Sequence, residues 1–457
     1  MTHNNETIIA QCTAQGNGAL ALLRLSGHSA FIITDSLSKL ANSKKLSTQQ
    51  THTIHYGWVI DKAGTIIDQV LFLVMRAPKT FTGEDTVEIT CHNNPFIIQN
   101  IIQCAIAAGA RIAYNGEFSR RAVENKKIDM LQAEAINDLI HANTQLALKQ
   151  SLSQLQGSFT HAITDLENKL IKALALSEAS FEFIDEENME FNLQIKDLIE
   201  SVLTEVTKLK KTYNQQQHIR QGIRIAIIGS VNAGKSSLFN ALLNKERAIV
   251  TNIAGTTRDT IEAGLYKNGN YWTLIDTAGI RSTNDIIEQM GIEKSYKEAQ
   301  SADIILLVFD SSVSLNSSEQ TIYNDLLKNY NNKIILIKNK IDLPQKNITF
   351  DTNVPSHESS DNNKTFITSI EGAIQEKIQH LFTSIESPFL LNQRHYNALL
   401  NLENNLLVIP PMLISNVSYE LVSYHLHDAI TTLSDLTGKT ISERGMDAIF
   451  REFCVGK

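Results

Sequence analysis

The chain has 457 residues, of which 42% are hydrophobic and 20% are charged, and its formal net charge is -8. This length accommodates about three domains, and the composition is that of folded globular protein. An acidic chain is not expected to wrap nucleic acid over a large surface, so any RNA contact should be local or shared with a partner. The four cysteines include no Cys-x-x-Cys pair, which argues against a zinc site or a disulfide framework. Neither a signal peptide nor a membrane-spanning apolar run is readable, so a cytoplasmic location without membrane contact is expected.

Short β-rich runs dominate the first segment, which ends near residue 118. Such runs, together with one expected helix near 95–108, indicate a compact α+β domain. The runs lie at 7–10, 19–25, 70–75 and 86–90.

Between about residues 119 and 215, apolar residues recur at spacings of three and four, which is the period of a helix face. Stripes of this kind are what helical bundles bury, so two or three long packed helices are expected. One stripe contains Leu152, Leu155, Phe159, Ile163, Leu166, Leu170 and Leu174, and another contains Ile195, Leu198, Val202, Val206 and Leu209.

From about 218 to 382, nearly continuous apolar runs of strand length alternate with helical segments. This pattern is typical of a parallel sheet that is buried on both faces. The runs are 223–228, 271–275, 303–309, 333–337 and 365–368, and the stretch 351–364 is expected to be a loop before the last strand.

Helical patterning returns after residue 383, so an α/β domain interrupts a helical region. We expect the two helical parts to pack together, with the α/β domain inserted between them. The predicted domains are 1–118 (N-terminal), 119–215 (first helical part), 216–382 (inserted α/β domain) and 383–457 (second helical part).

A phosphate-binding loop, the P-loop, occupies residues 229–236 with the sequence Gly-Ser-Val-Asn-Ala-Gly-Lys-Ser. It matches GxxxxGKS, follows a predicted strand and opens a predicted helix at 237–243, which is the context that the motif needs. Backbone N–H groups of the loop hold phosphates, Lys235 neutralises the β and γ oxygens, and Ser236 reaches a magnesium ion. By itself the motif leaves ATP and GTP open.

Two motifs supply the rest of a magnesium site. Asp-Thr-Ala-Gly at 276–279 ends a strand, so we expect Asp276 to bind magnesium through water and the Gly279 amide to sense the γ-phosphate. Gly-Thr-Thr-Arg-Asp at 255–259 lies where a switch loop should lie, and Thr257 is the candidate for the second magnesium hydroxyl.

The base is identified by Asn-Lys-Ile-Asp at 339–342, which follows a strand. The Asp342 carboxylate can accept two hydrogen bonds from the N1–H and the exocyclic amine of guanine, a donor pair that adenine lacks. Ser369, expected just after the last strand, is a candidate to support the base. Four short motifs in this order predict GTP as the substrate.

The residue after Gly279 is Ile280, whereas Ras-like enzymes place a water-positioning glutamine there. Another group must therefore orient water, and another cation must offset the charge of the transition state. Glu288 is the better candidate for water, although a solvated switch-region acid fits equally well. Asn232 in the P-loop is a candidate ligand for a monovalent cation, with oxygen chemistry suited to potassium.

The whole chain resembles the MnmE (TrmE) family of tRNA uridine-34 modification GTPases. The segments that carry the resemblance are 81–88 (Phe-Thr-Gly-Glu-Asp-Thr-Val-Glu), 116–119 (Gly-Glu-Phe-Ser), 127–135 (Lys-Ile-Asp-Met-Leu-Gln-Ala-Glu-Ala), 232–237, 255–259 and the C-terminal 453–457 (Phe-Cys-Val-Gly-Lys).

The resemblance implies a folate-binding N-terminal domain, a helical domain built from both flanks and an inserted Ras-like G domain. It also implies a homodimer through the N-terminal domains and potassium-dependent pairing of G domains. By this analogy Glu288 assists water and Cys454 contributes to one-carbon transfer, although Cys454 also fits as a small residue in a docked tail. The implied ligand sets are Asn232, Thr251, Ile253 and Thr256 for potassium; Ser236 and Thr257 for magnesium; Arg24, Glu88, Lys127 and Lys457 for a 5,10-methylene or 5-formyl tetrahydrofolate; and Asn232, Ala233, Gly234, Lys235, Ser236, Ser237, Thr251, Asn252, Ile253, Ala254, Gly255, Thr256, Thr257, Asp276, Thr277, Ala278, Gly279, Asn339, Lys340 and Asp342 for GTP or GDP.

The family works with an FAD flavoprotein, MnmG, in a heterotetramer. Together they would add an aminomethyl or carboxymethylaminomethyl group at C5 of the wobble uridine 34 in tRNA, with tetrahydrofolate as the carbon donor. The tRNA contact would be shared with the partner. The chain departs from the family where Asn93-Asn94 replaces Gly-Gly beside the expected folate pocket, where Ser230-Val231 replaces Arg-Pro in the P-loop, and where Ala14-Gln15 replaces Pro-Pro.

Two other functions fit part of this pattern. A ribosome-assembly GTPase would share the P-loop and Ile280, but such proteins usually append a basic RNA module, and this acidic chain has no recognisable KH-type GxxG. A folate-binding scaffold without turnover would require a silent G domain, and the intact Lys235, Ser236, Asp276 and Asp342 argue against it.

Overall fold

The structure is a computed structural model, and it divides into two compact units that are described separately. The first unit contains Met1–Asn137, Leu152–Thr204 and Asn397–Lys457, and the second contains Asp138–Ser151 and Glu205–Tyr396. The described residues are 6–180, 188–211, 213, 220, 222–243, 261–276, 295–350, 354–358, 364–383, 388–414 and 419–456.

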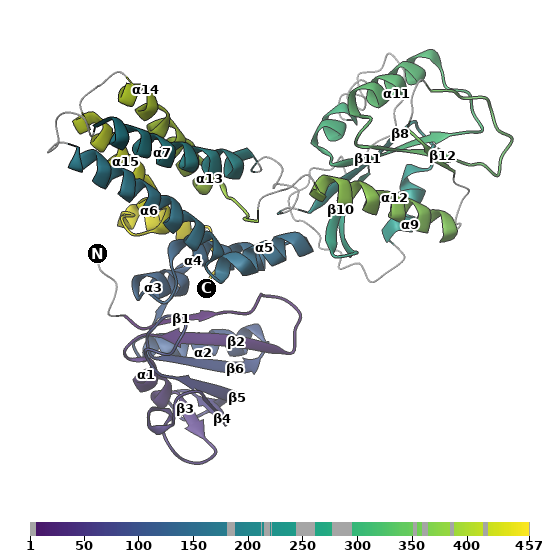
Figure 1. The fold of residues 1–457 in the computed structure, drawn as a ribbon. Helices are drawn as coiled ribbons and strands as arrows, with labels where there is room; N and C mark the ends of the chain where they lie inside the picture. The colour runs from purple at the N-terminus through teal and green to yellow at the C-terminus, as the bar shows by residue number, and fades with distance from the viewer. Residues whose placement is uncertain are drawn as a thin grey trace. The chain divides into compact units, whose positions relative to one another are not determined.

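A seven-stranded sheet forms the N-terminal part of the first unit (Figure 1). Its order is β3-β4-β5-β6-β2-β1-β7, and every neighbouring pair is antiparallel except β1 with β7. The predicted β-rich runs and the helix near 95–108 are confirmed, whereas β3, β4, β7 and α1 were not predicted. The elements are β1 (Ile8–Gln11), β2 (Leu20–Ser26), α1 (Ala30–Ser36), β3 (Ser38–Leu40), η1 (Leu46–Thr48), β4 (Thr53–Ile60), β5 (Ile66–Met75), β6 (Thr86–His92), α2 (Pro95–Ala107) and β7 (Arg111–Ile112).

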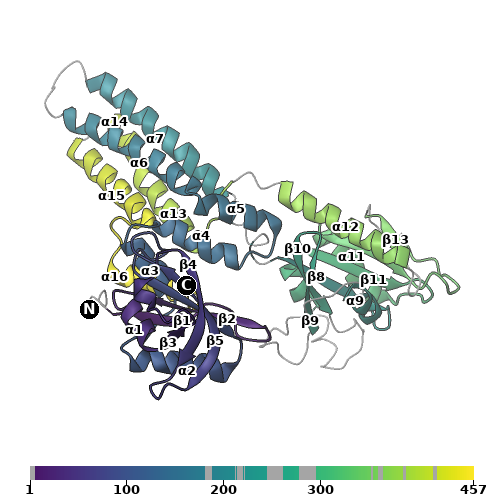
Figure 2. The ribbon, with the colours of Figure 1, turned by 90° about the horizontal axis from the view of Figure 1, so that it is seen from below.

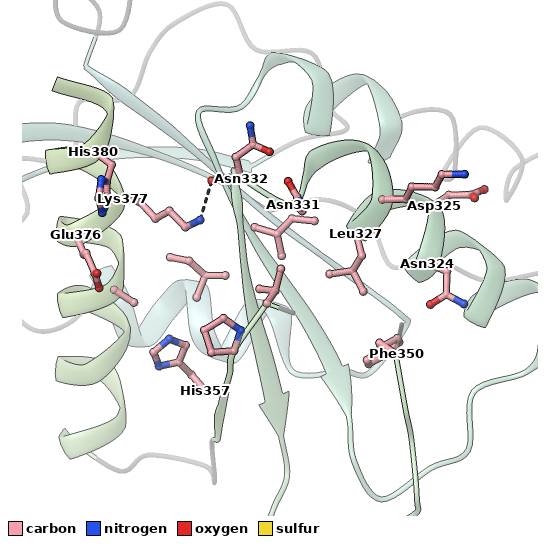
Figure 3. Close-up of a pocket in the computed structure, with 16 residues that line it drawn as sticks. Asn324, Asp325, Leu327, Asn331, Asn332, Phe350, His357, Glu376, Lys377 and His380 are labelled. Atoms are coloured by element: carbon pink, nitrogen blue, oxygen red, sulfur yellow. Dashed lines mark hydrogen bonds between the residues drawn. The ribbon is translucent and has the colours of Figure 1, made fainter. Parts of the chain in front are cut away.

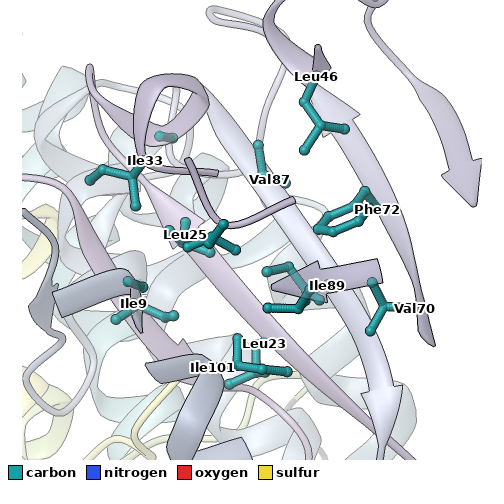
Figure 4. Packing of buried hydrophobic residues seen from close by; sticks show 14 of the residues in the cluster. Ile9, Leu23, Leu25, Ile33, Leu46, Val70, Phe72, Val87, Ile89 and Ile101 are labelled. Atoms are coloured by element: carbon teal, nitrogen blue, oxygen red, sulfur yellow. The ribbon is translucent and has the colours of Figure 1, made fainter. Parts of the chain in front are cut away.

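The two faces of this sheet differ because side chains alternate along each strand. One face is fully buried, and Figure 4 shows Leu23, Leu25, Phe72, Val87 and Ile89 packed together there. The opposite face carries Arg24 and Glu88 as a cross-strand pair and continues into exposed apolar side chains on β4 and β5. The sheet therefore presents a second face that its own helices do not fill.

Long helices make up the rest of the first unit. In both views α6 lies beside α15 (Figures 1 and 2), and the hydroxyls of Ser177 and Ser423 are 2.9 Å apart across this contact. The expected packing of an early helical part against a late one is confirmed. The helices of the chain between the two sheets and after them are α3 (Glu117–Glu124), α4 (Met130–Ile140), α5 (Gln145–Leu155), α6 (Ser158–Ala179), α7 (Asn188–Lys211), α13 (Gln393–Leu407), α14 (Ile409–Ile414), α15 (Tyr419–Thr437) and α16 (Glu443–Phe450).

The first predicted apolar stripe is divided between two helices. Helix α5 ends at Leu155, and α6 begins after Gly157, whose φ of 93° lies in the left-handed region that favours glycine. Leu152 is 47% exposed, whereas Phe159, Ile163 and Leu166 are buried. The spacing of the leucines does not reveal this break, because Gly157 lies between two stripe positions.

The second unit is built on a six-stranded sheet with the order β13-β12-β11-β8-β10-β9. Five strands are parallel and β9 runs antiparallel to β10, which confirms the predicted α/β part. Its elements are β8 (Ile223–Gly229), α9 (Lys235–Leu243), β9 (Ile261–Lys267), β10 (Asn270–Asp276), β11 (Ile304–Asp310), α11 (Ser317–Tyr330), β12 (Ile334–Asn339), β13 (Ser356–Glu358) and α12 (Lys364–Thr383).

The prediction of a last strand at 365–368 was wrong, because these residues open helix α12. One face of this helix is buried at spacings of three and four residues, by Ile367, Ile370, Ile374 and Ile378. The predicted strand covered only the first residues of this helix. The last strand is β13, inside the stretch predicted as a loop, and Ser369 therefore lies within α12 rather than after a strand.

Residues 138–151 group with the α/β unit rather than with the helical bundle. The backbone N–H of Gln145 donates to the carbonyl of Gly269 (2.9 Å), and that of Tyr271 donates to the carbonyl of Asn143 (2.8 Å). Arg220 also pairs with Asp138 at 2.5 Å. These backbone bonds join the start of α5 to the β9–β10 hairpin.

Candidate functional sites

The P-loop begins at the end of β8 and leads directly into α9. Asn232 has a φ of 61° and Gly234 a φ of 96°, so the backbone turns through left-handed conformations before Lys235 starts the helix. The Lys235 ammonium donates to the carbonyls of Gly229 (3.1 Å) and Ser230 (2.8 Å). Burial lowers the pKa of Lys235, and the charge of Asp276 offsets part of this effect. A bound phosphate would supply the negative charge that this buried ammonium favours.

A magnesium-type site adjoins the P-loop at the end of the neighbouring strand. The parallel pairing of β8 and β10 places Asp276 opposite Ile227. The Ser236 hydroxyl donates to Asp276 Oδ2 over 2.8 Å. Asp276 Oδ1 is buried and has no hydrogen-bond partner within the described part of the chain. An orphaned carboxylate oxygen beside a hydroxyl fits a hard divalent cation, held directly or through water.

The segment that would read the base is fastened to the same loop. Asn339 is buried and donates from Nδ2 to the carbonyl of Ala233 over 2.8 Å. Lys340 has a φ of 60° and donates to Asp310 over 2.7 Å. Burial alone would raise the pKa of Asp310, but hydrogen bonds from Lys340 and Ser312 outweigh it and hold that pKa below its ordinary value.

Asp342 lies beyond this anchored turn and is exposed, so its carboxylate is accessible to a base. The structure thus brings together Lys235, Ser236, Asp276, Asn339 and Asp342 around the carboxyl ends of the parallel strands. Ligands bind at this edge in open α/β sheets.

Ser369 is not part of this arrangement. It lies on α12, and its hydroxyl is 3.4 Å from His357 Nδ1. A separate cavity of about 1080 Å³ lies between α11, β12, β13 and α12 (Figure 3). Lys377 reaches across it to donate to the carbonyl of Asn332 (2.7 Å). None of the predicted nucleotide residues lines this cavity.

A second cluster lies on the outer face of the N-terminal sheet. Arg24 on β2 donates to Glu88 on β6 over 2.7 Å, and the two side chains are 19% and 12% exposed. The Arg24 guanidinium also lies 5.7 Å from the ring of Phe81 and 5.6 Å from that of Phe118. The aromatic rings limit where the cation can move, and its remaining donors fit a carboxylate or a pterin edge.

The third predicted folate residue, Lys127, is held at the rim by the loop that carries Phe81. Its ammonium donates to the carbonyl of Pro78 over 2.8 Å. Its methylenes lie against Gly83, where an added Cβ would lie 3.3 Å from Lys127 Cδ. Asn125 fastens the same loop by donating to the carbonyl of Thr82 (2.7 Å).

The C-terminal tail docks onto the same part of the first unit. Phe453 is buried with Phe450 and Met130, and the carbonyl of Cys454 accepts from the backbone N–H of Gly116 (3.3 Å). Gly456 has a φ of 91° and packs so closely that an added Cβ would lie 2.4 Å from the carbonyl of Gln11.

The register of the sheet places the strand that contacts this tail next to the strand that carries Arg24. Gln11 pairs with Leu23, the residue beside Arg24, and Phe118 follows Gly116 by two positions. Cys454 is exposed there, so its thiol is accessible.

The departure at Asn93-Asn94 has a local structural role. Asn94 caps α2 by accepting from the Phe96 N–H (2.9 Å), and Pro95 occupies the first turn. Asn93 donates to the carbonyl of Gly16 over 2.7 Å. The two asparagines therefore order the β6–α2 connection in place of glycines.

An ion network that the sequence analysis did not identify links α3 to the loop that carries Phe81. Arg111 forms paired hydrogen bonds with Glu117 (2.7 and 2.9 Å), and Arg121 joins Glu117 to Glu84. Burial alone would raise the pKa of Glu117, but bonds from Arg111, the Tyr114 N–H and Arg121 outweigh it and lower that pKa. Glu117 and Arg121 form a local i,i+4 pair, but the contact of Arg121 with Glu84 and that of Arg24 with the Phe118 ring have no local sequence signature, because these partners come from separate segments.

Several predicted residues lie outside the described residues. They are Thr251, Asn252, Ile253, Ala254, Gly255, Thr256, Thr257, Thr277, Ala278, Gly279, Ile280, Glu288 and Lys457.

A P-loop, a magnesium-type aspartate and a guanine-reading segment on one parallel sheet define the chain as a P-loop GTPase, a GTP hydrolase. Comparison with known proteins narrows this class. Residues 130–454 match the family model described as the MnmE helical domain, and residues 7–127 match that of the GTP-binding protein TrmE N-terminus. The chain belongs to the MnmE family.

The similarity to individual relatives extends over the full chain. The identity is 38% to the tRNA modification GTPase MnmE of Lachnoclostridium phytofermentans, covering 99% of both chains. It is also 38% to that of Parabacteroides distasonis, covering 99% of this chain and 100% of the relative. Among solved structures, the G domain of the T. maritima FeoB iron transporter is 26% identical and covers 35% of this chain and 98% of that chain, with a TM-score of 0.26. Within the described residues, no helix combines the length and apolar character needed to cross a membrane.

Proposed function

We propose that this GTPase modifies the wobble uridine of tRNA, as the names of its relatives suggest. With an MnmG-type flavoprotein it would add an aminomethyl or carboxymethylaminomethyl group at C5 of uridine 34. The observation that carries the proposal is that one chain holds both a GTPase site and the cluster of Arg24, Glu88 and the docked tail with its exposed Cys454. A generic GTPase has no need of the second cluster.

The carbon donor in this proposal is a 5,10-methylene or 5-formyl tetrahydrofolate bound at the N-terminal cluster. Arg24 and Lys127 supply cations for the glutamate carboxylates, and Glu88 supplies an acceptor for pterin donors. The support is geometric, since Arg24 and Glu88 are paired, mostly buried and bordered by Phe81 and Phe118. Lys457 would contribute a further cation.

The proposal includes a homodimer through the outer face of the N-terminal sheet. Ile54 is 64% exposed, and its neighbours Tyr56 and Leu71 are 44% and 42% exposed. Tyr56 pairs with Leu71 across β4 and β5, so these side chains form one contiguous apolar surface beside the Arg24 cluster. Surfaces of this kind are typical of protein interfaces, and a second copy would cover it and complete the folate pocket.

In the G domain, we propose magnesium at Ser236 and Thr257, and potassium at Asn232, Thr251, Ile253 and Thr256. Asn232 supports the cation role because its left-handed backbone places an exposed amide on the P-loop. Glu288 would orient the attacking water in place of a Ras-like glutamine. Potassium would offset the charge that develops during hydrolysis.

The direct test is nucleoside mass spectrometry of tRNA from a strain that lacks this protein. Loss of the C5 modification on wobble uridine, restored by the wild-type chain, is the expected result. Complementation with Lys235→Ala and, separately, Arg24→Ala should both fail, because the proposal requires both sites. Unchanged nucleosides in the deletion strain would refute the proposal. Rescue by Arg24→Ala would remove the folate cluster from it.

The cellular setting follows the same proposal. A tRNA-modifying enzyme with a flavoprotein partner acts in the cytoplasm, and the tRNA contact would be shared within the heterotetramer. The net charge of -8 supports a shared contact, since an acidic chain binds polyanions poorly by itself.

A further inference from the structure

We propose that Tyr323 is a positioning residue for the P-loop in GTP binding and hydrolysis. Tyr323 lies on α11, and its side chain is fully buried. Its hydroxyl donates to the carbonyl of Val308 (2.6 Å) and accepts from the backbone N–H of Ser230 (2.8 Å). One hydroxyl thus joins the end of β11 to the second residue of the P-loop.

This bond fixes the backbone from which the catalytic lysine takes its position. The carbonyl of Ser230 accepts from the Lys235 ammonium at 2.8 Å. Both backbone polar groups of Ser230 are therefore occupied, the N–H by Tyr323 and the carbonyl by Lys235. The peptide planes on either side of Ser230 cannot rotate without breaking one of these two bonds, so the phosphate cradle is preorganised.

The P-loop packs tightly against β11 at Gly229. An added Cβ on Gly229 would lie 2.1 Å from the Val308 carbonyl and 3.3 Å from the Tyr323 hydroxyl. Glycine is therefore required at position 229 for the loop to come close enough to bond with Tyr323.

A second ring holds Tyr323 in place. The ring of Phe350 stacks on it with centroids 5.6 Å apart and an angle of 23° between the planes. Phe350 also packs edge-on against Phe309 (5.1 Å), so it is itself anchored to the end of β11. Burial raises the pKa of Tyr323 to about 12. The hydroxyl therefore keeps its proton, and with it both hydrogen bonds, at any ordinary assay pH.

The consequence concerns both nucleotides, because GDP and GTP share the β-phosphate that the loop would hold. Removal of the hydroxyl takes away the acceptor of the buried Ser230 N–H in the loop and one donor to the Val308 carbonyl on β11. If the hydroxyl were purely structural, its loss would lower only the stability of the fold. If it positions the loop, its loss also lowers nucleotide affinity in the folded protein.

The test compares Tyr323→Phe with Tyr330→Phe in the full chain. Tyr330 ends the same helix, two turns after Tyr323, and its ring lies 5.9 Å from the Lys333 ammonium. Dissociation constants for GDP and GTP, steady-state kcat and KM, and thermal unfolding are measured for each. For Tyr323→Phe we expect both dissociation constants to rise about tenfold, with KM changing more than kcat. Unchanged constants in folded Tyr323→Phe, or an equal rise in Tyr330→Phe, would overturn the proposal.

A second pair of variants applies if Tyr323→Phe unfolds. Phe350→Leu keeps the hydroxyl but removes the stacked ring, and Phe350→Tyr keeps the ring. We expect Phe350→Leu to raise both dissociation constants about threefold, which is less than the loss of the hydroxyl itself, and Phe350→Tyr to behave like the wild type. Wild-type affinities in folded Phe350→Leu would overturn the proposal in this arm.

Discussion

The side-chain amide of Asn339 donates a hydrogen bond to the backbone carbonyl of Ala233, and the two atoms are 2.8 Å apart. This bond connects the base-reading segment to the P-loop. It also explains Gly234, because an added Cβ there would lie 2.1 Å from Asn339 Nδ2. The segment proposed to bind the base is therefore tied to the loop proposed to bind the phosphates.

Replacement of Asn339 should weaken both nucleotides. In Asn339→Ala the buried carbonyl of Ala233 loses its partner, and we expect GDP and GTP affinity to fall about tenfold. Fluorescence titration with labelled nucleotides measures this. Asn347→Ala, at an exposed position of the same domain, is the control and should bind as the wild type. Equal affinities in the two variants would contradict the linkage.

Asp342→Asn should exchange guanine for xanthine preference. The carboxamide offers a donor where guanine also has one, whereas xanthine presents a carbonyl there. We expect kcat/KM for GTP to fall by about a hundredfold or more and that for XTP to rise. Asp325→Asn, on α11, serves as the control for an equal change of charge. Retained GTP preference in Asp342→Asn would show that another group reads the base.

Glu88→Gln should weaken binding of 5-formyl tetrahydrofolate. The change removes the charge that holds Arg24, at 2.7 Å, between Phe81 and Phe118. We expect about a tenfold loss of affinity by calorimetric titration, since charge-assisted bonds are the stronger ones. The matched control is Glu124→Gln, which removes an acid from the more exposed i,i+4 pair with Arg120. A loss in both variants would point to a general effect of charge.

Glu117 should make stability depend on pH below neutrality. Its folded-state pKa lies below the ordinary value of 4.5, so the unfolded chain binds protons more readily. The stabilisation is therefore complete above about pH 5.5 and is lost as the pH falls through the folded pKa.

The measurement is urea unfolding near pH 7 and near pH 3.5. We expect Glu117→Gln to lose about 3 kcal/mol at the higher pH, because it leaves the buried Arg121 without one of its two acids. The gap between the wild type and the variant should narrow at the lower pH. A constant gap would mean that Glu117 acts through packing rather than charge.

Hydrolysis should be faster in potassium than in sodium at equal ionic strength. Asn232 offers an exposed amide oxygen on the P-loop for the larger cation. We expect Asn232→Ala to remove most of the difference between the rates in potassium and in sodium. GDP affinity should stay within about threefold of the wild type, since the loop binds phosphate through its backbone. Equal wild-type rates in the two salts would remove Asn232 from the cation role.

The sequence predicted strongly periodic elements well and short ambiguous ones poorly. The buried run of β11 was found because its first six residues, Ile304 to Phe309, are all apolar. The segment 365–368 was misassigned because a short apolar window does not distinguish a strand from the start of a helix. Ser369 was then misplaced for the same reason. Lys235, Asp276 and Asn339 stay predicted nucleotide residues, because contiguous motifs indicate their chemistry.

The sequence by itself determined that the chain is a GTPase, since each motif is local and its function depends on residues a few positions apart. Only the tertiary structure decided which distant side chains support those motifs. The bond from Tyr323 to Ser230 crosses 93 positions of the chain, and the contact of Asn339 with Ala233 crosses 106. The contact of Arg24 with the Phe118 ring results from packing, and no sequence motif predicts it. Folding brings such partners together by burial and hydrogen bonding, and no periodicity in a single sequence records the result.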